Sequence, residues 1–130
     1  MRRRAGLVVC LGLALMAGAE VSQDWMKKVP ATDRARTNPY AAQASAIAAG
    51  GRLYADHCSR CHGADLEGRH GKPSLRTPVV MNATDGELFW LLRNGDLRHG
   101  MPSWSDLPEG ERWQVVSFLK NSRQATGGSQ

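Results

Sequence analysis

The chain of 130 residues is predicted to form a small all-α domain with three main helices and long loops. In three segments, residues 41–57, 84–94 and 108–119, apolar side chains recur at the three- and four-residue spacing of an amphipathic helix. Between these segments, glycine and proline interrupt the sequence, and no stretch has the two-residue alternation that is typical of a strand. The length is that of one small domain.

The first 19 residues have the pattern of a secretory signal peptide. Three arginines at positions 2–4 precede an uncharged apolar stretch at 5–16, and Ala-Gly-Ala at 17–19 matches the small residues before a cleavage site. The apolar stretch is shorter than the roughly 20 residues that span a bilayer. We therefore expect cleavage after residue 19 and a periplasmic protein without stable membrane insertion. Retention as an uncleaved membrane anchor is the alternative. Cys10 lies within this segment and would be removed with it.

The charge of the chain does not indicate a nucleic-acid partner. Its formal net charge is +5, but three positive charges belong to the predicted signal peptide, so the remainder carries +2. That remainder has no basic run and no interleaving of basic and aromatic residues. We expect protein partners that recognise a local surface, and no binding to nucleic acid.

Residues 20–40 are mixed in character and mostly polar. Pro30 and Pro39 would interrupt a helix, so we expect an extended leader that lies on the domain. Trp25 and Met26 are the apolar side chains that could hold it there.

The segment 41–57 is rich in alanine and predicts the first main helix. Ile47, Gly50, Leu53 and Tyr54 recur in it at three- and four-residue spacing. The helix runs directly into the most distinctive motif of the chain and would hold the residues of that motif in register.

Residues 58–62 have the sequence Cys-Ser-Arg-Cys-His, which is the C-x-x-C-H arrangement that attaches haem covalently to protein. Cys58 and Cys61 would lie about one helical turn apart, which suits thioether bonds to the two vinyl groups of one porphyrin. His62 follows at once and can present its imidazole to the iron. The motif therefore predicts one covalently attached haem c.

Three other interpretations of this motif fit its sequence less well than a haem site. A structural zinc site would need a fourth ligand from His57, His70 or His99, at spacings unlike those of paired zinc-binding clusters. A thioredoxin-like redox pair normally follows a buried strand, whereas the residues before Cys58 predict a helix. A disulfide between the two cysteines would leave the adjacent His62 without a role.

Local signals predict the elements that follow the motif. Residues 63–81 contain glycine and proline breaks and predict a long loop of the kind that wraps around something. Thr84 begins a capping-box pattern, Thr-Asp-Gly-Glu, so the second main helix starts there and ends at Asn94-Gly95. Residues 96–106 predict another loop.

The third main helix is predicted to begin around Pro108, because proline suits the first helical turn. Glu109 and Glu111 would lie near the positive end of its dipole. The final residues, 125–130, predict a flexible tail, which places the domain itself at residues 41–124.

From about Ile47 to Leu119 the chain resembles a class I cytochrome c, a monohaem protein with histidine and methionine ligands. Gly50 and Tyr54 stand eight and four residues before the first cysteine, as a glycine and an aromatic residue do in that family. The resemblance implies a small cytochrome c fold wrapped around one haem. It also implies that the glycine lets the first and last helices cross closely, with aromatic residues of the last helix at the crossing. The candidates are Trp113 and Phe118.

The same resemblance implies how the iron would be ligated. Pro73 follows His62 at the spacing of a proline whose carbonyl accepts the Nδ1 proton of the ligand histidine. Met101, in the sequence Gly-Met-Pro before the last helix, takes the place of the second axial ligand. A methionine that fills a gap in the core is the structural alternative. Met81 and His99 are the other candidate ligands.

Several further side chains have two interpretations each. Trp90 would donate its indole N–H to a haem propionate or would be a core aromatic residue. Three arginines would pair with the propionates or remain solvated: Arg76, Arg93 and Arg98. Three basic residues near the motif would form a docking surface around the haem edge or a rim of ordinary solvated charges: Arg60, Arg69 and Lys72. His57 and His70 are expected to be exposed and without a role.

These features together predict a monomeric electron carrier and no enzyme, because nothing in the loops indicates a nucleophile, a general base or a substrate pocket. Its partners would be redox proteins such as a periplasmic dehydrogenase or a terminal oxidase. One alternative is a haem subunit bound permanently to a quinoprotein-type dehydrogenase. A further alternative is a haem-based redox or gas sensor in which Met101 dissociates.

Overall fold

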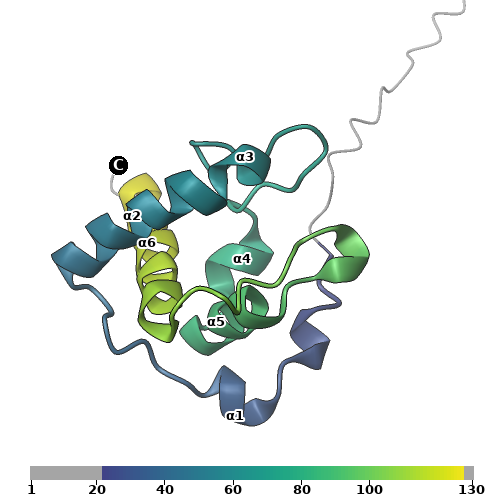
Figure 1. Ribbon diagram of the computed structural model, residues 1–130, viewed down its shortest axis with the longest axis horizontal. Helices are drawn as coiled ribbons and strands as arrows, with labels where there is room; N and C mark the ends of the chain where they lie inside the picture. The colour runs from purple at the N-terminus through teal and green to yellow at the C-terminus, as the bar shows by residue number, and fades with distance from the viewer. Residues whose placement is uncertain (1–21, 128–130) are drawn as a thin grey trace, which may run out of the picture.

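The computed structural model describes residues 22–127, so the predicted signal peptide lies outside the described part. The fold is all-α, as predicted, and its three main helices are α2 (Ala44–His57), α5 (Asp85–Asn94) and α6 (Glu109–Gly127). Figure 1 shows them with the shorter elements. These are η1 (Met26–Lys28), α1 (Ala31–Arg34), α3 (Ser59–His62), α4 (Pro78–Asn82) and η2 (Leu97–His99). None of the helices between residues 22 and 127 has both the length and the apolar character needed to cross a membrane.

Helices α2 and α6 cross at a point of backbone contact (Figure 1). A Cβ atom placed on Gly50 would lie only 1.9 Å from the carbonyl oxygen of Gln114, so only glycine allows this approach. Beside the crossing, the rings of Tyr54 and Phe118 are 5.2 Å apart. The predicted crossing is therefore present with Phe118. Trp113 is not its aromatic partner, because it stacks instead on Phe89 of α5 at 3.9 Å.

Helix α5 begins and ends at the residues that its sequence predicts. The side chain of Thr84 accepts a hydrogen bond from the backbone N–H of Glu87, whose carboxylate in turn accepts one from the backbone N–H of Thr84. Gly95, at φ +70°, ends the helix in a conformation that favours glycine. The apolar face of α5 packs into the core against α6, and Phe89 is fully buried there.

The leader is not extended, which corrects the prediction for residues 20–40 over its described part. It contains the two short helices η1 and α1, because Pro30 precedes α1 in an extended conformation and starts that helix instead of interrupting one. Trp25 is 2% exposed and packs in the main apolar core, as expected for a residue that holds the leader on the domain.

Three loop and tail boundaries also differ from the predictions. Helix α4 occupies the end of the expected 63–81 loop, because Pro78 sits in its first turn, where a proline is pre-organised. The expected 96–106 loop contains η2 and an isolated antiparallel bridge between Asp96 and Met101. Helix α6 continues to Gly127, past the expected boundary at residue 124.

Candidate haem site

The C-x-x-C-H motif lies at the junction of α2 and α3. Cys58 caps the end of α2, its backbone N–H donating to the carbonyl of Tyr54 at 2.8 Å. Its own carbonyl accepts from the backbone N–H groups of Cys61, at 3.2 Å, and His62, at 2.9 Å. This single helical turn therefore carries both thiols and the imidazole, as the spacing predicts. Both cysteines are free.

The imidazole of His62 is oriented by Pro73. Its Nδ1 lies 2.9 Å from the proline carbonyl oxygen, as the resemblance implies. A carbonyl can only accept, so Nδ1 carries the proton and Nε2 keeps a lone pair for a metal ion. A hydrogen bond of this kind also strengthens the imidazole as a ligand.

Backbone contacts between the motif and the following loop fix the position of Pro73. The carbonyls of His62 and Cys61 accept from the backbone N–H groups of Gly68, at 2.7 Å, and Arg69, at 3.1 Å. A Cβ atom at Gly68 would lie 2.4 Å from the carbonyl oxygen of Lys72, so the loop can fold this closely only at a glycine. The loop returns to the motif just before Pro73 and brings its carbonyl to the imidazole.

Met101 is held by the loop between α5 and α6. Its backbone N–H and carbonyl both pair with Asp96, each at 3.0 Å, in the isolated bridge. The hydroxyl of Ser103 donates to the carbonyl of Arg93 at 2.6 Å, and the backbone N–H of Trp104 donates to the carbonyl of Leu92 at 2.8 Å. These bonds attach the methionine loop to the end of α5.

A mainly apolar cavity of about 310 Å³ lies between the motif and the methionine loop. It is lined by five residues predicted to bind or support haem: Cys58, Cys61, His62, Pro73 and Met101. Leu75, Val80 and Leu91 supply apolar wall. An imidazole nitrogen, a thioether sulfur and two thiols around an apolar cavity form a donor set suited to a covalently held haem with two axial ligands. The residues therefore fit this cofactor.

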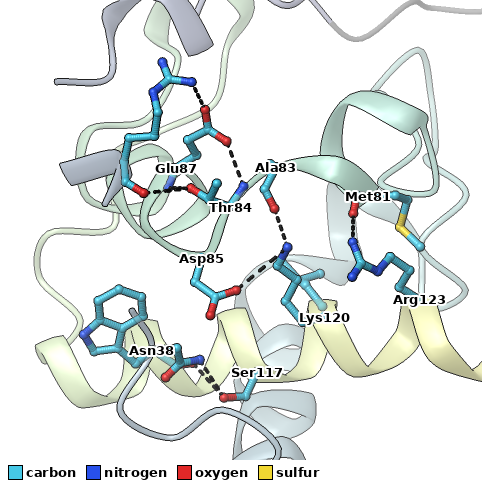
Figure 2. A network of polar contacts seen from close by, with 12 residues as sticks. Asn38, Met81, Ala83, Thr84, Asp85, Glu87, Ser117, Lys120 and Arg123 are labelled. Carbon is cyan, nitrogen blue, oxygen red and sulfur yellow. Dashed lines mark hydrogen bonds and ion pairs between the residues drawn. The ribbon is translucent and has the colours of Figure 1, made fainter. Parts of the chain in front are cut away.

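The structure separates the alternative iron ligands. Met81 lies on α4 outside the cavity, next to Arg123, whose guanidinium donates to its carbonyl (Figure 2). His99 does line the cavity, and its Nδ1 lies 2.8 Å from a carboxylate oxygen of the buried Asp96. Of the two alternatives to Met101, only His99 is in place to compete with it.

Other candidate side chains lie away from the cavity. Trp90 is half-buried against the core and does not line it, which favours its interpretation as a core aromatic residue. Arg76 pairs with Glu67 at 3.1 Å, and Arg93 pairs with Asp33 at 3.3 Å. Neither of these arginines lines the cavity, and nor do Arg98, Arg60 and Arg69. Among the expected basic residues, only Lys72 borders it.

Three aromatic wall residues were not identified from the sequence. The rings of His57 and Trp104 lie 5.3 Å apart, and both residues line the cavity, so His57 is in contact with the methionine loop. Trp25 reaches the cavity from the leader. Trp104 follows the predicted ligand Met101 by three residues, and this closeness in sequence could have indicated a place near the haem. Nothing local connects Trp25 to residues so distant in sequence.

Two of the three other interpretations of the motif, the redox pair and the zinc site, find little support in this geometry. Burial, and secondarily the neighbouring Cys61, raises the pKa of the Cys58 thiol to about 11, whereas a redox-active pair depends on a readily formed thiolate. Among residues 22–127, no three His, Cys, Asp or Glu side chains are grouped so as to hold a metal ion, so a closed zinc site has no ligand set there.

Comparison with known proteins agrees with the haem site. Residues 45–119 match the family model described as cytochrome C oxidase, cbb3-type, subunit III. The fold is similar to that of cytochrome CL from the marine methylotrophic bacterium Methylophaga aminisulfidivorans, with a TM-score of 0.57 and 25% sequence identity over 78% of this chain and 69% of that one. The family match spans more than half of the chain. The chain therefore belongs to this family and is a c-type cytochrome, an electron-transfer protein that carries haem c.

Proposed function

We propose that the protein is a class I cytochrome with one covalent haem, ligated by His62 and Met101, that carries single electrons in the periplasm. Cys58 and Cys61 would form the thioether bonds. The observation that carries the proposal is the convergence of both thiols, the oriented imidazole and Met101 on one cavity. A bound haem would supply the one-electron chemistry, and the chain would supply its ligands and exclude water.

The way in which the chain holds the two ligands favours a carrier. Pro73 fixes the ring of His62, and the paired hydrogen bonds to Asp96 fix the backbone of Met101. A thioether ligand and an apolar cavity both favour the ferrous state, so we expect a comparatively high potential. If His62 and Met101 both ligated the iron, small gases would have no free coordination site, which argues against a sensor.

The partners follow from the family and from the predicted secretion. We propose a periplasmic dehydrogenase as electron donor and a terminal oxidase as acceptor, and the description of the family as an oxidase subunit supports the second of these. Permanent attachment to a quinoprotein-type dehydrogenase remains the second candidate. Co-purification of a dehydrogenase in constant stoichiometry would favour permanent attachment, and a monomeric haem protein would favour the diffusing carrier.

Visible spectra of the oxidised and reduced protein, with carbon monoxide added to the reduced sample, test the ligand assignment. We expect low-spin haem in both states and no reaction with carbon monoxide. Met101→Ala should lower the midpoint potential and admit carbon monoxide. Met81→Ala is the matched control, because the same side chain is removed outside the cavity. An unchanged potential in Met101→Ala would transfer the ligand role to His99.

A separate variant tests covalent attachment. Cys58→Ala should lose or weaken haem retention, because only one thioether could still form. Denaturation in acid, followed by extraction with organic solvent, removes haem that is not covalently bound. A full complement of covalently bound haem in Cys58→Ala, equal to that of the parent protein, would contradict the attachment role of this residue.

A further inference from the structure

We infer that residues 22–40, which we call the strap, complete the haem cavity, with Trp25 as a direct haem contact, and that the start of α5 holds the strap closed. The inference rests on the proposed function only for the presence of haem in the cavity. The strap lies outside residues 45–119, which the family model matches, so the family does not account for it.

The strap enters the cavity wall at its N-terminal end. Ser22 and Trp25 both line the cavity, together with His62 and Met101. Trp25 also belongs to the apolar core that contains Val80, another wall residue. The side chain of Trp25 is therefore fixed in place and forms one wall of the cavity. Its removal would open the haem to water at that point.

An ion pair between the exposed Arg34 and the buried Glu87 holds the strap on α5. Arg34 donates through Nη2 to the carbonyl of Met26 at 3.0 Å, and its Nη1 pairs with the carboxylate of Glu87. Glu87 is 2% exposed, and its other oxygen accepts from the backbone N–H of Thr84 at 2.7 Å. Figure 2 shows Glu87 beside Thr84 at the start of α5. One carboxylate therefore caps α5 and anchors the strap.

The same helix turn sets the distance between strap and domain. A Cβ atom at Gly86 would lie 2.0 Å from the carbonyl oxygen of Asp33 and 3.0 Å from those of Arg34 and Arg36. All three contacts are backbone atoms of the strap, which cannot rotate away as the end of a side chain can. Any side chain at Gly86 would push the strap outward, although Gly86 itself does not line the cavity.

The C-terminal end of the strap is fixed separately on α6. The Asn38 amide donates to the carbonyl of Trp113 at 3.1 Å and to the hydroxyl of Ser117 at 2.9 Å, and Figure 2 shows Asn38 and Ser117 together. A displacement at Gly86 would therefore be taken up on the Trp25 side of α1. A side chain at Gly86 would therefore move Trp25 and alter the cavity, although Gly86 does not line it.

The strap thus has a role in the chemistry of the haem. Trp25 keeps water away from one side of the cavity, and exclusion of water disfavours the additional charge of ferric haem. Trp25 would be the haem contact, and Gly86, Arg34 and Glu87 would be positioning residues that act through it.

The test compares variants of the full-length holoprotein, produced with haem-attachment machinery. Trp25→Ala removes the contact, Trp25→Phe keeps an aromatic wall, and Gly86→Ala displaces the strap. Gly110→Ala is the control, because its Cβ would meet only the side chain of Tyr40, also in the strap, at 3.4 Å. The readouts are the midpoint potential and the rate at which dissolved oxygen takes one electron from the ferrous protein.

We expect Trp25→Ala and Gly86→Ala to show a lower potential and several-fold faster oxidation, while Trp25→Phe and Gly110→Ala stay close to the parent. Unchanged potential and oxidation rate in both altered variants would overturn the inference and reduce the strap to a packing element. If Gly86→Ala does not fold, Arg34→Gln, which removes the ion pair, replaces it under the same criteria. Failure of the proposed function itself would be visible in the parent protein, as missing covalent haem or a ligand set without Met101.

Discussion

The crossing of α2 and α6 provides the sharpest test of the fold, through the substitution Gly50→Ala. The added Cβ would lie 1.9 Å from the carbonyl oxygen of Gln114, 2.5 Å from its carbonyl carbon and 3.0 Å from Cβ of Phe118. Since non-bonded heavy atoms settle at about 3.5 Å, the two helices would have to separate by more than about 1 Å. Such a shift would also loosen the contact between the rings of Tyr54 and Phe118.

Two opposing contributions set the size of the stability change in Gly50→Ala. Forcing an extra carbon into a packed contact costs ~1–3 kcal/mol, and the cost lies at the upper end where backbone must move. Alanine regains about 1 kcal/mol of helix propensity over glycine. We therefore expect Gly50→Ala to lower the free energy of unfolding by about 2 kcal/mol.

The neighbouring Gly51→Ala is a matched control on the same helix. Its Cβ would meet only ring atoms of Phe118, at 3.3 and 3.4 Å, and a side chain can adjust to this. We expect it to be neutral or to stabilise by up to about 1 kcal/mol. Urea unfolding of the haem-containing variants, followed by far-ultraviolet circular dichroism, measures both. Equal stability of the two variants would refute the close backbone contact as the reason for glycine at position 50.

Two further predictions concern α5 and α6. Thr84→Ala removes the hydroxyl that accepts from Glu87 N–H and donates to the Arg34 carbonyl at 3.1 Å. We expect it to lower the free energy of unfolding, measured in urea, by about 1 kcal/mol. An unchanged free energy of unfolding would mean that the cap is unimportant. Burial lowers the pKa of Lys120 from its ordinary 10.5, so the folded state releases this proton at lower pH than the unfolded chain. The free energy of unfolding should therefore gain a rising contribution as pH increases toward 10.5, and Lys120→Met, measured at several alkaline pH values, should lack it. If the free energy of unfolding changed with pH identically in the parent protein and in Lys120→Met, the lowered pKa of Lys120 would be contradicted.

Local sequence patterns predicted much of the site because short-range geometry dictates it. One helical turn suffices to place Cys58, Cys61 and His62 together, and a capping box needs only the four residues from Thr84 to Glu87. The position of Met101 followed from a resemblance in loop pattern, and the structure places this residue on the cavity. The part played by Met101 at the iron is still a prediction.

Other features could not be predicted because they join residues that the chain keeps far apart. Trp113 has the same helical periodicity whether it faces α2 or α5, and only the packing of three helices directs it to Phe89. Trp90 likewise lies on an amphipathic helix, and the rotation of that helix turns it away from the cavity. Periodicity predicts that a face is buried without predicting what covers it.

The sequence by itself determined the helical class, the haem motif and the caps of α5, because each depends on neighbours within a turn or two. Only the tertiary structure decided that the leader forms a wall of the cavity through Trp25. The reason is physical: the ion pair of Arg34 and Glu87 and the close backbone contact at Gly86 join segments about fifty residues apart. No local pattern encodes the closure of so long a loop.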